Sequence, residues 1–252
     1  MNQAGRYQIL EELGRGATGV VYRATDPAIG KTVALKSIRL SDAGDAEEKR
    51  LVRDRLLSEA QSAGILSHPH IVTIYDVFES GELAYISMEY VDGASLEEML
   101  RAGALPEREK FLQFLRQIAE ALDYAHRKEI VHRDIKPANI IVSGRRPGTE
   151  QVAKIAGFGV APFLASEVAH NGTLIGTPNY MSPEQIQGLP VGGKSDQFSL
   201  AAVVYELLCG AKPFVAENVQ ALLYSICKQN PKPVERANPL LNETVGKVMT
   251  RA

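Results

Sequence analysis

The hydrophobic pattern of the chain changes once, near residues 91–93, and this change limits the folds that the chain can adopt. Before it, short runs rich in β-branched and aromatic residues alternate with glycine-containing turns, a pattern that predicts β-strands. After it, apolar residues recur at helical spacing over long segments. We therefore expect an α+β protein in which a small, antiparallel β-rich lobe with one main helix precedes a larger, mainly helical lobe.

The same pattern predicts the individual elements. Strands are expected over residues 7–13, 20–25, 32–38, 71–78 and 83–90, and one helix lies among them at about 46–66. Further helices are expected over residues 106–127, 198–208, 218–228 and 240–250. The segment 198–208 is apolar nearly all round, which is typical of a helix buried inside its domain. With 252 residues, the chain can bury a core as one large or two small domains.

Composition and charge exclude several classes of protein. The formal net charge is −2, so we expect no broad basic surface for nucleic acid. The longest apolar stretch, 200–209, contains Glu206 and is too short to span a membrane. The first six residues are polar and unlike a signal peptide, and Cys209 and Cys227 match no zinc or redox spacing. We therefore expect a cytoplasmic domain, either as a whole protein or as the cytosolic part of a larger one.

A glycine-rich segment, residues 14–21, carries Gly14, Gly16 and Gly19. The same spacing occurs in dinucleotide-binding proteins, in which a helix begins at the loop and directs its N-terminus at the pyrophosphate. Here residues 20–24 continue as a strand, which favours a β-hairpin tip whose backbone N–H groups can lie over phosphates. A plain hairpin turn without a ligand is the alternative interpretation.

Two charged residues are predicted to meet behind this hairpin. In the strand 32–38, alternation places Ala34 and Lys36 on one face, where a small residue beside a cation would admit an adenine ring and hold its phosphates. In the following helix, Glu59 lies at the edge of an apolar stripe that includes Leu56, Ala60 and Ala63. A carboxylate turned toward the core needs a partner, and Lys36 is the obvious one. The alternative is that Glu59 is a solvated charge on the helix surface.

The segment 130–141 carries the strongest chemical signal. Two apolar, strand-like runs flank a loop with five polar side chains that can converge: His132, Arg133, Asp134, Lys136 and Asn139. Asp134 could accept a hydroxyl proton, Lys136 could neutralise a transferring phosphoryl group, and Asn139 could bind a metal ion.

Taken together, these ordered motifs resemble the Hanks-type serine/threonine protein kinases, and the bacterial members in particular. The resemblance extends from about Tyr7 to the C-terminus and includes residues 181–184, Met-Ser-Pro-Glu, and Asp196, which opens the predicted buried helix. It implies the bilobal protein-kinase fold over residues 1–252, with residues 7–91 as the N-lobe and hinge and residues 92–252 as the C-lobe.

The resemblance also implies a role for each matching residue. Gly14, Gly16 and Gly19 would cover the phosphates of ATP or ADP, and Lys36, paired with Glu59, would hold the α- and β-phosphates. The adenine ring would lie among Val21, Ala34, Met88 as gatekeeper, and the hinge residues Glu89 and Val91. Asp134 would be the catalytic base and Asn139 a ligand of Mg²⁺. Lys136, together with Thr177, indicates a protein substrate that is phosphorylated on serine or threonine.

The segment after the Gly157-Phe158-Gly159 motif would be the activation segment. It contains Ser166 and Thr173, either of which could be phosphorylated and then pair with Arg133 to order the segment. Such phosphorylation could occur between two copies in an autophosphorylation dimer. Plain loop hydroxyls are the alternative interpretation of both residues.

Gly157 is the main departure from the family pattern. It occupies the position of the aspartate that binds magnesium in the family's Asp-Phe-Gly motif, and glycine has no side-chain ligand. The sequence leaves three interpretations open: a kinase whose catalysis is impaired, a pseudokinase that binds nucleotide as a scaffold, and an active kinase silenced by an introduced glycine. Because glycine removes a carboxylate that would repel the triphosphate, we expect the chain to bind ATP or ADP with only weak dependence on Mg²⁺.

The C-terminus is the second departure. Family members usually continue past residue 252 to a helix with an arginine that pairs with the glutamate at the position of Glu184. We therefore expect either a trimmed chain or an abbreviated C-lobe, with Glu184 left without that arginine as its partner.

Overall fold

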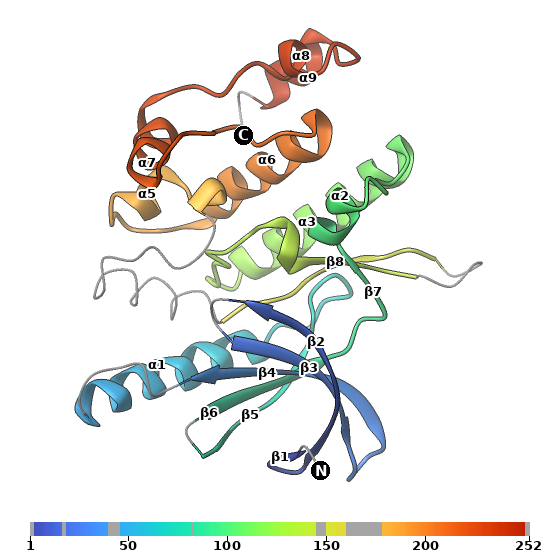
Figure 1. Cartoon of the computed structure of the whole chain (residues 1–252), viewed down its shortest axis with the longest axis vertical. Helices are drawn as coiled ribbons and strands as arrows, with labels where there is room; N and C mark the ends of the chain where they lie inside the picture. The colour runs from blue at the N-terminus through green and yellow to red at the C-terminus, as the bar shows by residue number, and fades with distance from the viewer. Residues whose placement is uncertain are drawn as a thin grey trace. The chain divides into compact units, whose positions relative to one another are not determined.

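The computed structural model describes residues 3–16, 19–39, 46–81, 83–144, 150–159 and 178–249. The chain divides into two compact units (Figure 1). The first contains Met1–Gly93 and Ser143–Ile175, and the second contains Ala94–Val142 and Gly176–Ala252. Within the described residues, no helix combines the length and the apolar content that a membrane crossing requires.

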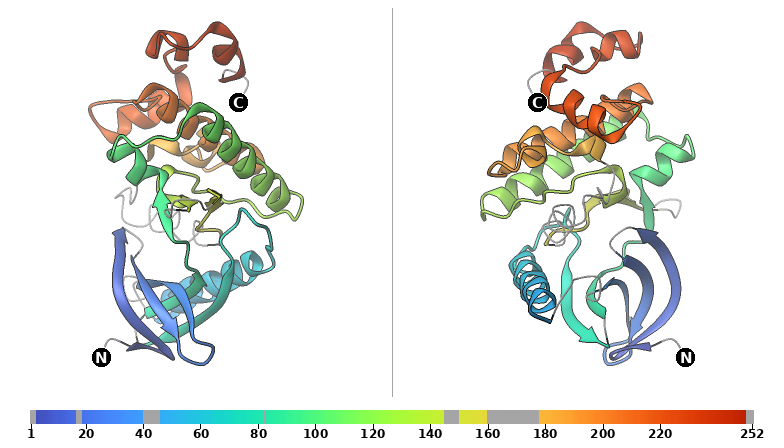
Figure 2. Two further views of the ribbon diagram at one scale, coloured as in Figure 1. Left: turned by 90° about the vertical axis from the view of Figure 1, so that its right-hand side faces the viewer. Right: turned by 60° about the vertical axis from the view of Figure 1, so that its left-hand side comes forward.

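The first unit is built on a six-stranded antiparallel sheet with the strand order β1-β2-β3-β4-β6-β5. Its strands are β1 (Gln3–Ala4), β2 (Tyr7–Gly16), β3 (Gly19–Asp26), β4 (Lys31–Arg39), β5 (Ile74–Ser80) and β6 (Leu83–Glu89). Helix α1 (Ala46–Gly64) lies along one face of this curled sheet (Figure 2). The antiparallel β-rich unit with one main helix is thus confirmed.

The period-2 alternation of the strands explains how the sheet buries both faces. On β4, Val33 and Leu35 belong to one core cluster, with Tyr7, Ala24 and Tyr85. Ala34 and Ile38 belong to the other, which contains Leu56 and Ala60 of α1 and Ile86 and Met88 of β6. Because Lys36 alternates with Leu35, its side chain starts from the same face of the strand as Ala34.

The first unit is not continuous in sequence. Strand β9 (Ala153–Ile155) returns to it, where the Ile155 N–H donates to His70 O at 2.9 Å and Ile155 O accepts from the Val72 N–H at 2.8 Å. Ile71 and Ile155 form a parallel bridge, and both are buried. Residues 143–175 therefore group with the strand-rich unit, although a division at residue 91 placed them in the helical lobe.

The second unit is mainly helical. Its elements are α2 (Leu96–Arg101), α3 (Arg108–His126), η1 (Pro137–Asn139), β8 (Ile140–Ser143), η2 (Pro178–Tyr180), α5 (Pro183–Ile186), α6 (Gly193–Cys209), α7 (Val219–Lys228), α8 (Val234–Ala237) and α9 (Glu243–Met249). A short strand, β7 (Gly93–Ser95), precedes α2. Helix α6 contacts α3, α5, α8 and η2, and Val203 at its centre is fully buried, which confirms the predicted buried helix.

Several element boundaries differ from the sequence-based prediction. Helix α6 begins five residues earlier than expected, at Gly193 rather than 198, because the polar residues of its first turns are buried in hydrogen bonds. The strand expected from 71 begins at Ile74, since the Ile71 N–H closes a turn onto His68 O at 3.1 Å. Helix α2 was not expected; a capping box formed by Ser95 and Glu98 starts it.

Candidate functional site

The glycine-rich segment forms the tip of the β2–β3 hairpin. Gly16 is paired with Gly19 across the two strands, and residues 17 and 18 lie outside the described residues. Gly19 has a φ of 135°, and a Cβ there would lie 1.7 Å from Ser37 O, so only glycine fits. A Cβ on Gly14 or Gly16 would meet nothing within 4 Å. The segment is therefore a β-hairpin, as expected, and not the start of a helix.

The apolar residues expected to surround an adenine ring share one cluster. Ala34 and Met88 belong to its buried core, and Val21 and Val91 pack against it half-buried. Ala156, directly before Gly157, packs against the same cluster. The structure therefore brings together four predicted residues from β3, β4, β6 and the segment after β6: Val21, Ala34, Met88 and Val91. Ala156 joins them from the segment after β9.

Lys36 and Glu59 are both half-buried in the first unit, on β4 and α1. Glu59 lies beside Leu56, Ala60 and Ala63, which are buried, so the predicted apolar stripe is confirmed. Each of the two charged residues has an interaction partner. The pairing of Lys36 with Glu59 stays a prediction.

The Gly157-Phe158-Gly159 motif follows β9 and turns against α1. Gly157 has a φ of 97°, in the region that favours glycine. Phe158 is buried. A Cβ on Gly159 would lie 2.6 Å from Glu59 O and 2.8 Å from Ala63 Cβ, so the motif is closely packed on the helix that carries Glu59.

Two side chains of the loop at residues 132–139, Lys136 and Asn139, converge on the carboxylate of a third, Asp134. Lys136 Nζ lies 2.7 Å from Asp134 Oδ2 and 3.0 Å from Oδ1. Asn139 Nδ2 donates to Asp134 Oδ2 at 2.9 Å and to the Asp134 backbone oxygen at 2.7 Å. Asp134 stays 28% exposed, so a proton donor from solvent can still reach it.

The other two polar residues of the loop do not join this group. His132 is fully buried, and its Nδ1 accepts a hydrogen bond from the Asp134 N–H at 3.2 Å. Arg133 has a φ of 66°, and its backbone oxygen accepts a hydrogen bond from Gln185 Nε2 at 2.7 Å. The predicted convergence of five side chains is therefore correct for three, while His132 and the Arg133 backbone shape the loop.

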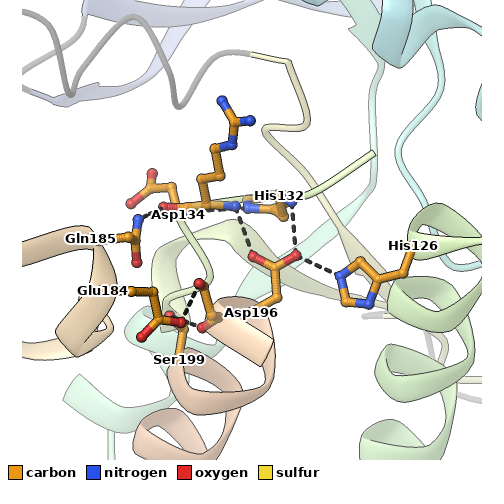
Figure 3. A network of polar contacts seen from close by, with 9 residues as sticks. His126, His132, Asp134, Glu184, Gln185, Asp196 and Ser199 are labelled. Carbon is orange, nitrogen blue, oxygen red and sulfur yellow. Dashed lines mark hydrogen bonds and ion pairs between the residues drawn. The ribbon is translucent and has the colours of Figure 1, made fainter. Parts of the chain in front are cut away.

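Asp196, in the first turn of α6, anchors the loop from below (Figure 3). Its two carboxylate oxygens accept hydrogen bonds from the His132 and Arg133 N–H groups, both at 2.8 Å, and His126 Nε2 lies 2.8 Å from Oδ2. Burial by itself raises the pKa of Asp196, but the hydrogen bond with His126, the electrostatic interaction with His132 and the two backbone N–H groups outweigh burial and lower it.

Hydrogen bonds among residues 180–206 further stabilise the second unit. Glu184 Oε1 accepts a hydrogen bond from Ser195 Oγ, so Glu184 has a hydrogen-bond partner other than the arginine that the family resemblance implies, and the lack of that arginine stays a prediction. Ser199 Oγ donates to Tyr180 O at 2.6 Å, and the Tyr180 hydroxyl donates to Glu206 Oε2. Burial and this contact with Glu206 raise the pKa of Tyr180 well above its usual range.

Sequence reasoning missed His126, Gln185 and Ser195, and gave Asp196 no role. Their partners are far away in sequence, by 70 residues for the His126–Asp196 contact, so no local spacing reveals them. The expected regulatory residues Ser166, Thr173 and Thr177 lie outside the described residues.

The residues present fit a magnesium ion poorly. No group of three or more His, Cys, Asp or Glu side chains within the described ranges could hold a metal ion. Asn139 uses its Nδ2 on Asp134, which leaves only its neutral Oδ1 as a ligand. Mg²⁺ in proteins relies on carboxylates, and Gly157 supplies none.

Comparisons with known proteins agree with this geometry. A family model described as "Protein kinase domain" matches residues 7–247. The chain is 37% identical over 250 residues to serine/threonine-protein kinase PrkC of Bacillus subtilis, covering 99% of this chain and 37% of that protein. It is 34% identical over 254 residues to serine/threonine-protein kinase PknB of Mycobacterium tuberculosis, covering 98% and 39%. The chain thus spans less than two fifths of the length of these curated relatives. It belongs to the protein kinase domain family and is related to bacterial serine/threonine kinases.

Proposed function

We propose that this domain binds ATP and ADP, and that it transfers the γ-phosphoryl group of ATP to serine or threonine hydroxyls of proteins at a rate reduced by Gly157. The observation that carries the proposal is the carboxylate of Asp134, held by Lys136 and Asn139 within hydrogen-bonding distance. A loop that had lost its use would not need to keep this arrangement.

The chain's own residues supply most of the chemistry. Asp134 accepts the proton of the attacking hydroxyl, and Lys136 beside it balances charge on the phosphoryl group. Lys36, paired with Glu59, holds the α- and β-phosphates under the glycine hairpin. The apolar cluster with Ala34 and Met88 receives the base, next to the backbone of residues 89–91.

Gly157 is expected to slow the transfer step. An aspartate at this position would bring the metal that neutralises the phosphates, a contribution of about 3–5 kcal/mol at the transition state. Its loss lowers the rate on the order of 10²–10⁴-fold. The apolar cluster proposed to receive the base does not include Gly157, so nucleotide binding can persist when transfer is weak.

Weak dependence on magnesium is the first test. A carboxylate beside a triphosphate repels it in the absence of a metal ion, and glycine removes that repulsion. We expect the Kd for ATP, measured by calorimetry, to differ by no more than about 3-fold between a buffer with about 5 mM magnesium and a buffer with a chelator. Binding that requires magnesium strictly would contradict the proposal.

A pseudokinase that binds nucleotide and acts as a scaffold is the second candidate, and Gly157 is the observation that favours it. Restoring the carboxylate with Gly157→Asp separates the two. We expect autophosphorylation with radiolabelled ATP to rise by about 10²–10⁴-fold over the parent, with Gly157→Asp/Asp134→Asn as an inactive control. If neither protein autophosphorylates although both still bind nucleotide, the scaffold function is supported instead.

The biological setting follows the same family. The expected partner is a protein with a serine or threonine acceptor, and a second copy of the domain could serve in autophosphorylation. Ser166 and Thr173 are the proposed acceptors in this chain, with Arg133 as the group that binds the phosphate and Thr177 as part of the acceptor site. We place the domain in the cytoplasm, by itself or as the cytosolic part of a longer protein.

A further inference from the structure

The ion pair between Lys154 and Glu89 joins two distant segments of the first unit. Lys154 Nζ lies 2.6 Å from Glu89 Oε1, and the two side chains are only 19% and 24% exposed. Most ion pairs in the described part of the chain have a side chain that is half exposed or more, which makes them weak. The Lys154–Glu89 pair is shielded enough to fix geometry.

Glu89 is held at three points. Besides the contact with Lys154, its N–H donates to Thr73 O at 2.8 Å, and its Oε2 accepts from the Thr73 N–H at 3.4 Å. Glu89 is the last residue of β6, directly after Met88, and residues 90 and 91 follow it without regular structure. Met88 and Val91 both belong to the apolar cluster of the proposed base site.

Lys154 is anchored on the opposite side. Its neighbours in β9, Ala153 and Ile155, are fully buried, and Ile155 is hydrogen-bonded to the segment at His70 and Val72. The backbone of Lys154 therefore cannot follow Glu89 if Glu89 moves. A fixed cation placed opposite a carboxylate at the end of a strand holds that strand end in place.

We propose that Lys154 is a positioning residue of the nucleotide site. It holds Glu89, and through Glu89 the backbone of residues 89–91, in the conformation that receives the base. Without Lys154, the half-buried carboxylate of Glu89 turns toward water and carries the strand end with it, displacing Met88 and Val91. This inference rests on the nucleotide binding proposed above.

The test is a double-mutant cycle read out as binding of adenosine and of ATP by calorimetry. We expect Lys154→Met and Glu89→Gln each to weaken the binding of both ligands on the order of 10-fold. The double variant should bind no more weakly than either single variant. The loss of affinity should be the same for adenosine and for ATP, because the ion pair acts at the base and not at the phosphates. Lys154→Arg, which keeps the charge, should bind within about 3-fold of the parent.

Lys31→Met is the matched control. Lys31 also lies on the sheet of the first unit, with its Nζ 3.9 Å from the centre of the Tyr75 ring, and it forms no hydrogen bond or ion pair with Glu89. Its removal should leave both affinities unchanged. The melting temperature of each variant shows whether it is folded, and Lys154→Arg and Glu89→Gln keep the test decisive if Lys154→Met does not fold.

The outcomes separate the two proposals. A parent that binds neither adenosine nor ATP overturns nucleotide binding and this inference together. A parent that binds both, with Lys154→Met binding equally well, overturns the inference alone. Lower melting temperatures with unchanged affinities would show that the pair only stabilises the fold. Losses of affinity in the two single variants that add up in the double variant would show that the two residues act independently. Either result would also overturn the inference.

Discussion

The loop at residues 132–139 and the turn at Gly157-Phe158-Gly159 are built in different ways. Asp134 sits in a loop whose backbone is fixed by Asp196 and Gln185, and Asp196 also joins α6 to α3 through His126. Gly157 sits in a turn that is held by the backbone, by buried Phe158 and by the close packing of Gly159 on α1. Loss of a side chain that anchors the loop backbone, such as Asp196, therefore disturbs the fold, whereas an aspartate at 157 can be lost without structural damage.

The largest effect is expected at the loop. In the Gly157→Asp background, Asp134→Asn removes the group that accepts the hydroxyl proton, and the initial rate of phosphorylation should fall about 10²–10⁴-fold. Nucleotide affinity and the unfolding midpoint in urea should change little, because asparagine keeps the shape of the side chain. An unchanged rate would show that Asp134 is not the base.

The second-largest effect is expected on stability, when the carboxylate of Asp196 that anchors the loop is removed. Asp196→Asn places an amide against the two backbone N–H groups of His132 and Arg133, which we expect to lower the free energy of unfolding at pH 7 by about 3 kcal/mol. Urea titrations of parent and variant measure it. Equal stability at pH 7 would rule out the anchoring role.

The same pair of proteins should respond differently to acid. The pKa of Asp196 is lowered in the folded state, so its stabilising contribution is complete above the unfolded pKa of about 3.9 and is lost as the pH falls through the lower folded value. The stability difference between parent and Asp196→Asn should therefore be constant from neutral pH down to about 4 and then shrink. A difference that grows below pH 4 would contradict this sign.

The smallest effects are expected at the turn. At a φ of 97°, Gly157→Ala should lower the free energy of unfolding by about 1 kcal/mol. Gly157→Asn should be milder, because asparagine tolerates positive φ better than alanine. Gly14→Ala is the control, since its Cβ would meet nothing within 4 Å, and should be neutral or slightly stabilising. A Gly157→Ala variant as stable as the parent would mean that the turn relaxes freely.

Local patterns predicted the parts of the molecule that depend on neighbours in sequence. Alternation on β4 placed Ala34 and Lys36 on one face, and the loop spacing brought Asp134, Lys136 and Asn139 together. Contacts between distant segments could not be predicted in this way. Gln185 reaches Arg133 across 52 residues, and Ser195 was not recognised as the partner of Glu184.

The return of β9 to the first unit has a consequence for the order of folding during synthesis. The chain leaves the ribosome from its N-terminus, yet the backbone groups of His70 and Val72 find their partner only at Ile155. The strands of the six-stranded sheet and α1 are all made before β9, but the segment around Ile71 therefore stays uncovered while the loop carrying Asp134 is already being made. A nascent chain that ends before β9 should be sensitive to proteases in its first ninety residues, and one that includes β9 should be protected.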